Sequence, residues 1–310
     1  MTNVVSVSTY SLREELGPIS LAYTDAHGDE QTFAQDFPQV FDITDFPGRA
    51  GRDLSVTAVE AVAFQFDGVE DPAIDAFARQ ARETGLALLN MAVDVGDLLQ
   101  SDPARRAADV AALQRWIARV ADVGFRFVRV NPGSPFSTGH GAEPPAHLVA
   151  ALTELGAYAA EHGVRLLVEN HGGPSSDPTW MAALLDAVGA DNLGLLLDLG
   201  NFDPLQGPLL AALSAEPGSV PTDPFAGVDL TSVYEGIDAL APRAELVHVK
   251  AHDVDGRGGV GPIDLPRALA ILRRHGYDGP LTIEYEGGGG DPWAKTARVV
   301  DLTAAAISAP

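Results

Sequence analysis

The sequence contains no cysteine among its 310 residues. This absence excludes disulfide bonds, iron–sulfur clusters and thiolate zinc sites, so any bound metal has to be held by oxygen and imidazole ligands. Basic residues are also scarce, because 20 Lys and Arg stand against 43 Asp and Glu, for a net charge of −23. Nucleic acids and anionic membrane surfaces bind clustered Lys and Arg, so neither is expected as a partner.

Long apolar runs are missing as well. No stretch reaches the roughly 18–20 apolar residues that a membrane-spanning helix needs. The start, MTNVVSVSTYSLREELG, lacks the basic and apolar regions of a secretory signal. We therefore expect a soluble protein of the cytoplasm. With 46% hydrophobic residues the chain can bury a large core, and its length fits one α/β barrel or two ordinary domains.

Short apolar runs alternate with segments rich in Ala, Leu, Arg and Glu along the chain. The apolar runs have the length of buried parallel strands, and the segments between them are typical of helices. Several of these helical segments open with Asp-Pro and close on Gly, which suit the first turn and the C-terminal cap of a helix. The predicted strands are residues 4–9, 58–66, 86–93, 125–131, 164–170, 193–200, 244–250 and 280–286.

Eight strand–helix units in about 300 residues predict a (β/α)8 TIM barrel, which we expect to form a single domain over residues 1–310. A doubly wound sheet fits less well, because no GxGxxG motif follows the first strand and no linker divides the chain. Two extended segments interrupt the rhythm, residues 24–57 after the first strand and residues 202–232 after the sixth. Long loops of this kind lie on the catalytic face of a barrel, so the second is expected to shape or cover a substrate site.

Four predicted strands end in a residue type that binds metals. LLVEN contains Glu169, LLLDLG contains Asp198, ELVHVK contains His248 and LTIEYEG contains Glu284. An acid or imidazole at the end of a buried strand is costly without a partner, and convergence of the four would create a site for one divalent cation. Solvated acids at strand ends are the alternative. Three carboxylates and one imidazole favour Mn²⁺, Mg²⁺ or Co²⁺, with Zn²⁺ less typical.

Alternation along the strands places further polar side chains on the same face. His171 is expected to share the face of Glu169, while Lys250 and His252 share that of His248. These three are candidates for contact with the substrate or with the metal ligands; the alternatives are a loop histidine and a buried ion pair. At the end of the fourth strand, Arg129 and Asn131 are positioned either to meet a hydroxylated substrate or to form a packed salt bridge.

Four motifs together resemble those of the sugar phosphate isomerase/epimerase superfamily, the xylose-isomerase-like TIM barrels. The motifs are VENHGG at 168–173, DLGNF beginning at Asp198, VHVKAHD at 247–253 and GYDGPLTIEYEG at 276–287. The resemblance covers most of the chain and is strongest from about residue 160 onward. It implies that one divalent metal is bound by Glu169, Asp198, His248 and Glu284.

The sequence departs from the epimerase branch of this superfamily at two places. That branch usually has a His three residues after the metal-binding Asp, where this chain has Asn201, and an Arg several residues after the metal-binding His, for which Arg257 is only a loose counterpart. Asn201 is therefore a candidate substrate contact of a different kind. The run Gly287–Gly290 follows the eighth strand, where TIM barrels often bind phosphate; a flexible turn is the alternative interpretation.

The resemblance implies a metal-dependent isomerase or epimerase of a small sugar or polyol. Glu169 and Glu284 would transfer the proton, and the metal would stabilise an enediolate. A dehydratase of an inosose- or dehydroshikimate-like substrate on the same site is the alternative. An endonuclease-type phosphodiesterase and a non-catalytic sugar-binding barrel are less favoured, the former because of the charge of −23. Relatives are often dimers or tetramers, so a homo-oligomer is compatible with the resemblance.

Overall fold

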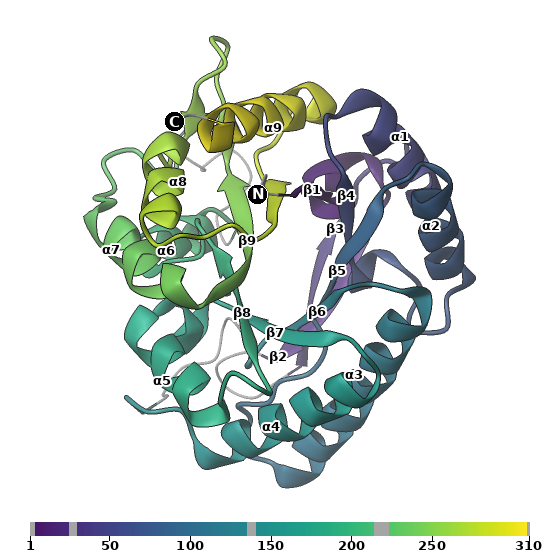
Figure 1. The fold of residues 1–310 in the computed structure, drawn as a ribbon, viewed down its shortest axis with the longest axis vertical. Coiled ribbons are helices and arrows are strands. Elements are labelled where there is room, and N and C mark those ends of the chain that lie inside the picture. The colour runs from purple at the N-terminus through teal and green to yellow at the C-terminus, as the bar shows by residue number, and fades with distance from the viewer. Residues whose placement is uncertain (1–3, 25–29, 135–140, 214–222, 309–310) are drawn as a thin grey trace.

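A computed structural model describes residues 4–24, 30–134, 141–213 and 223–308 of the chain. Parallel strands close into a barrel in which neighbours in sequence are neighbours in space, and the first strand pairs with the last (Figure 1). This arrangement confirms the predicted (β/α)8 fold. The barrel strands are β1 (Val5–Ser8), β4 (Ala58–Val62), β5 (Ala87–Val93), β6 (Phe127–Val130), β7 (Arg165–Glu169), β8 (Gly194–Asp198), β9 (Ala244–Ala251) and β12 (Leu281–Tyr285).

Helices surround the barrel (Figure 1). Asp71, Asp102 and Asp177 each accept a hydrogen bond from the backbone N–H two residues later, and a proline follows each of them in the first helical turn. Caps of this kind stabilise a helix by about 1 kcal/mol. The helices are α1 (Phe46–Asp53), α2 (Pro72–Glu83), α3 (Pro103–Val123), α4 (Ala146–Glu161), α5 (Pro178–Val188), α6 (Asp203–Leu213), α7 (Thr231–Leu240), α8 (Leu265–Arg274) and α9 (Pro292–Ser308). No helix among the described residues is both long and apolar enough to cross a membrane.

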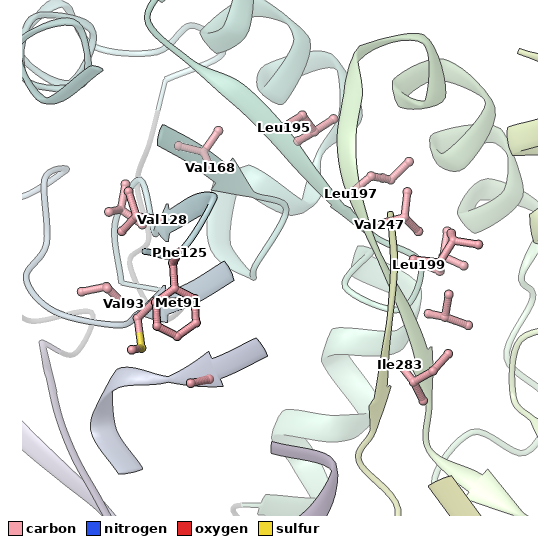
Figure 2. Packing of buried hydrophobic residues seen from close by; sticks show 14 of the residues in the cluster. Met91, Val93, Phe125, Val128, Val168, Leu195, Leu197, Leu199, Val247 and Ile283 are labelled. Atoms are coloured by element: carbon pink, nitrogen blue, oxygen red, sulfur yellow. The ribbon is translucent and has the colours of Figure 1, made fainter. Parts of the chain in front are cut away.

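Most of the hydrophobic core lies between the barrel and the helices. Figure 2 shows part of it, with Met91, Val128, Leu197 and Ile283 contributed by four different strands. A second, smaller cluster lies inside the barrel, where the other face of each strand points. This inner cluster, called the barrel floor below, consists of Ala58, Leu89, Phe127, Leu167, Leu196 and Leu246.

The extended segments contain secondary structure of their own. Residues 24–57 contain β3 (Glu30–Gln35) and helix α1. The strand β3 forms an antiparallel hairpin with β2 (Ile19–Thr24), which lies just before this segment and follows the 3₁₀ helix η1 (Thr9–Glu15). The segment after the sixth strand is partly helical, because α6 occupies residues 203–213 even though it contains Pro208. Residues 214–222 of that segment lie outside the described residues. A shorter hairpin of β10 (Asp253–Val254) and β11 (Val260–Gly261) follows β9.

Candidate metal centre

A layer of charged side chains lies directly above the barrel floor. Side chains two positions apart on a strand point to the same face. The residue two positions after each floor residue therefore also points into the barrel, one layer closer to its carboxyl end. Leu167 is followed by Glu169, Leu196 by Asp198 and Leu246 by His248, all of them buried. The same step leads from Ala58 to Glu60 and from Phe127 to Arg129. An apolar layer inside the barrel is therefore followed by a charged layer at the carboxyl end of the barrel.

Glu169, Asp198 and His248 converge at the centre of this layer. Each offers one ligand atom, and these atoms all lie within 4.8 Å of one another. The Nδ1 atom of His248 lies 3.5 Å from Glu169 Oε1 and 3.6 Å from Asp198 Oδ2. Glu284 adjoins the group, with its Oε2 atom 3.3 Å from the same Nδ1. The structure thus brings the four predicted ligands together.

The donor atoms of this group fit a divalent cation. Among the described residues, the buried atoms Asp198 Oδ2, Glu169 Oε2 and His248 Nδ1 make no hydrogen bond, although charged groups lie close to each. Buried polar atoms without a hydrogen bond are rare in folded proteins, and some of them are the atoms that bind an ion or a ligand. Carboxylate oxygens and one imidazole nitrogen are ligands for Mn²⁺, Mg²⁺, Co²⁺ or Zn²⁺.

Glu60 holds the far side of the His248 ring. Its Oε1 atom lies 2.8 Å from His248 Nε2 and accepts a second hydrogen bond of 2.8 Å from Asn90 Nδ2. When the ring proton is on Nε2 and forms a hydrogen bond to Glu60, Nδ1 presents its lone pair to the centre. Burial lowers the pKa of His248, but Glu60 and Glu284 outweigh it, so without a cation the pKa is raised well above its usual value.

Sequence reasoning missed Glu60. The available signal was a single charged residue in the middle of the apolar run AVEAV, which is unusual for a strand that is buried on both faces. Only the closed barrel shows which side chain it meets, because His248 lies on a strand that is far away in the sequence.

Lys250 lies among carboxylates and not on the surface of the cavity. Its Nζ atom is 3.1 Å from Asp198 Oδ2 and 2.6 Å from both Glu284 Oε2 and Glu286 Oε1. Burial lowers the pKa of Lys250, but the three carboxylates outweigh it and raise the pKa well above its usual value. This lysine therefore stays charged and offsets part of the negative charge around the centre. The sequence left contact with the substrate, contact with the metal ligands and a buried ion pair open for Lys250, and the structure pairs it with the predicted ligands Asp198 and Glu284.

Arg129 plays a similar part on the opposite wall. Its Nε atom lies 2.9 Å from Glu169 Oε2, and one terminal nitrogen lies 2.5 Å from Asp94 Oδ1 and 2.9 Å from Asn131 Oδ1. Asn131 also donates to Asp94 at 2.7 Å. Asp94 was not predicted, although it follows the third strand just as Asp198 ends the sixth. The same rule about acids at strand ends would have found it.

The remaining predicted residues lie around the centre at different depths. Asn201 donates to Glu169 Oε1 at 3.2 Å and accepts from Gln206 at 2.9 Å. His171 faces the cavity, and its Nδ1 atom is buried without a hydrogen bond to any described residue. His252 is more remote: its ring packs on Phe225 with 4.9 Å between centroids, and its Nδ1 atom lies 3.8 Å from a Glu286 oxygen.

A cavity of about 120 Å³, called the inner cavity below, opens onto the centre. One side is apolar and comes largely from the β2–β3 hairpin, through Ile19, Leu21 and Phe33. Tyr10 of η1 joins this side, and burial together with Glu286 raises its pKa to about 12, so its phenol stays protonated. The other side is polar and consists of Asp94, Arg129, Glu169, His171, Glu284 and Glu286.

Comparison with known proteins gives the family. The family described as xylose isomerase-like TIM barrel matches residues 49–302. No curated protein sequence matches the chain. Among solved structures, an L-ribulose 3-epimerase has a TM-score of 0.66 at 18% identity, covering 99% of this chain and 95% of that one. A D-allulose 3-epimerase from Methylomonas sp. in complex with D-allulose has a TM-score of 0.61 at 16% identity, covering 97% and 96%.

A third similar structure is a xylose isomerase-like TIM barrel protein from Mycobacterium smegmatis in complex with magnesium. Its TM-score is 0.58 at 16% identity, covering 99% of this chain and 98% of that one. At such identities the structural likeness establishes the fold alone, and the family match over residues 49–302 carries the assignment. This chain belongs to the xylose isomerase-like TIM barrel family.

Proposed function

We propose that the protein is a divalent-metal-dependent isomerase or epimerase of a small sugar or polyol. The observation that carries the proposal is the convergence of Glu169, Asp198 and His248 within 4.8 Å at the open end of a barrel, beside a cavity. Glu284 would complete the ligand set from the adjoining strand. A cation bound there would polarise a substrate carbonyl and stabilise the negative charge of an enediolate.

Glu169 and Glu284 are the residues suited to move the proton. They reach the inner cavity from β7 and β12, which are separated on the barrel wall by β8 and β9. One carboxylate would take the proton from the carbon beside the carbonyl, and the other would return a proton to the same carbon from the opposite face or to its neighbour. The first outcome is epimerisation and the second is isomerisation. Arg129 and Lys250 hold these two carboxylates in place.

The names of the similar structures support the proposal, although each name describes that protein and not this chain. Two of them are named as 3-epimerases of ketoses, one in complex with D-allulose, and a third contains magnesium. The structures compared above give no support to the dehydratase alternative. Asn201 fills the place where the epimerase branch has a histidine, and it acts on Glu169 through a hydrogen bond.

Removal of the metal tests this function directly. We expect chelated protein to lose its activity and unfold at a lower temperature, because a ligand that binds only the native state at 100 times its Kd stabilises it by about 2.7 kcal/mol. The activity assay is exchange of the proton beside the carbonyl of D-allulose or L-ribulose with D₂O, followed by NMR. Added Mn²⁺, Co²⁺ or Mg²⁺ should restore both properties. The proposal would be overturned if neither the melting temperature nor the exchange rate changed on chelation or on reloading with metal.

The Glu60→Gln substitution tests how His248 is positioned. We expect metal affinity to fall by about 10–100-fold, since a neutral amide no longer fixes the ring proton on Nε2 or raises the basicity of Nδ1. Titration calorimetry with Mn²⁺ measures the affinity, and the control is Glu83→Gln at the exposed end of α2. With saturating Mn²⁺ the variant should recover much of its kcat. Equal affinities in the two variants would show that Glu60 has no part in holding the metal.

A further inference from the structure

A second cavity adjoins the inner cavity and is much larger. It measures about 470 Å³ and is called the outer cavity below. The two cavities share Leu21, Asp94 and His171 in their walls, so they meet at the hairpin and at the end of β5. From there the outer cavity reaches Ala108 on α3.

The sizes of the two cavities suit two parts of one ligand. One water occupies about 10–15 Å³ on this measure, so the inner cavity holds roughly ten water-sized groups, close to the dozen or so heavy atoms of one hexose. The outer cavity is nearly four times larger. A monosaccharide whose carbonyl end lies at the metal centre would leave the outer cavity filled with water only. Its distal end would point toward the shared wall.

The charge around the inner cavity opposes a phosphorylated ligand. Asp94, Glu169, Asp198, Glu284 and Glu286 are carboxylates, and among the described residues Arg129 and Lys250 are the Arg and Lys side chains that form ion pairs with them. These seven side chains carry three more negative than positive charges, so a divalent cation bound by the neutral form of His248 would still leave the site negative. Both cations already touch at least two carboxylates each. A phosphate dianion would therefore face net repulsion.

The outer cavity and the glycine turn also disfavour phosphate. Three aspartates, Asp94, Asp97 and Asp109, line the outer cavity. Arg105 is the one Arg or Lys side chain among the described residues that line it. At the Gly287–Gly290 turn, where barrels often bind phosphate, the N–H of Gly289 donates to Glu14 at 3.2 Å. One backbone N–H of this turn is thus already bonded to a carboxylate.

We propose that the substrate is an uncharged ketose extended by a second neutral sugar or polyol unit, with the ketose end in the inner cavity and the extension in the outer cavity. This inference rests on the proposed function and adds the class of substrate. The apolar wall of Ile19, Leu21 and Phe33 would cover one face of the ketose unit, while the hydroxyl groups of the extension would meet the polar side chains of the outer cavity.

Three ketoses that differ only in the substituent on their last carbon test the inference: D-fructose, D-fructose 6-phosphate and 6-O-α-D-glucopyranosyl-D-fructose. With Mn²⁺-loaded protein and exchange into D₂O as the readout, kcat/KM should be at least about tenfold higher for the disaccharide than for D-fructose. For D-fructose 6-phosphate, kcat/KM should be at least about 100-fold lower than for D-fructose. A phosphate that reacts as fast as D-fructose, or a disaccharide that reacts no faster, would overturn the inference while leaving the proposed function intact.

Two tryptophan substitutions on α3 locate the extension. Ala108 lines the outer cavity and Ala107 does not, although both are exposed on the same helix. In Ala108→Trp the indole should fill part of the outer cavity, so the kcat/KM ratio of disaccharide to D-fructose should fall about tenfold. Ala107→Trp should keep the wild-type ratio. Equal ratios in both variants would remove the outer cavity from the substrate site, whereas no exchange with any of the three ketoses would count against the proposed function itself.

Discussion

Glu284→Gln is expected to lower kcat by about 10³-fold or more while the protein stays folded, because an amide cannot accept the proton that the carboxylate transfers. Glutamine also removes one negative ligand from the centre, so the Mn²⁺ affinity should fall as well. The measurement is D₂O exchange with saturating Mn²⁺, which separates the loss of proton transfer from the loss of metal. Glu169→Gln should behave in the same way, since both carboxylates face the inner cavity.

The control for this experiment is Glu235→Gln, on an exposed face of α7. It removes the same charge far from the cavity and should leave kcat within about twofold, as substitutions away from the site usually do. Far-ultraviolet circular dichroism checks that each variant is folded. Glu284→Gln protein that is folded, loaded with Mn²⁺ and as active as the control would remove Glu284 from the proton transfer.

Lys250→Met is expected to destabilise the metal-free protein by about 3–5 kcal/mol, the usual cost of removing one partner from a buried ion pair. Asp198, Glu284 and Glu286 would then lie close together without the cation that touches all three. Urea unfolding in the presence of a chelator measures the change. Saturating Mn²⁺ should return part of the lost stability, because the metal supplies positive charge next to two of the same carboxylates.

The chain offers a natural control, since Lys295 is its only other lysine. Its Nζ atom donates to the carbonyl oxygen of Gly288 at 3.0 Å in an exposed position, so Lys295→Met should change the free energy of unfolding by no more than about 0.5 kcal/mol. If Lys250→Met cost as little as Lys295→Met, the carboxylates would be balanced in some other way and the electrostatic account of the site would be wrong.

The barrel was predictable from the sequence because its signals are local. Each strand is a short apolar run, and the helices between them carry caps such as Asp71 and Asp102. The convergence of Glu169, Asp198 and His248 also followed, because the ends of parallel strands in a barrel meet at one face.

What the sequence did not predict depends on contacts between distant segments. Glu60 meets His248 across the barrel, and nothing near it in the sequence indicates that contact. The β2–β3 hairpin lies in a segment without clear periodicity, yet Leu21 and Phe33 form the apolar wall of the cavity. The sequence could not decide between substrate, metal ligands and a buried ion pair as the contacts of Lys250, since strand period alone gives the face of a side chain and not the partners that surround it.

The pairing of β1 with β12 has a consequence for how the protein is made. Val5 pairs with Leu281, so the two strands that close the barrel are synthesised almost the whole chain apart. Until β12 leaves the ribosome, β1 and β9 each have an unpaired edge, and such edges invite pairing with other chains. Contacts this distant in sequence also slow folding. Because Glu284 lies on β12, the event that protects the last edges of the sheet is the one that delivers the fourth side chain to the centre.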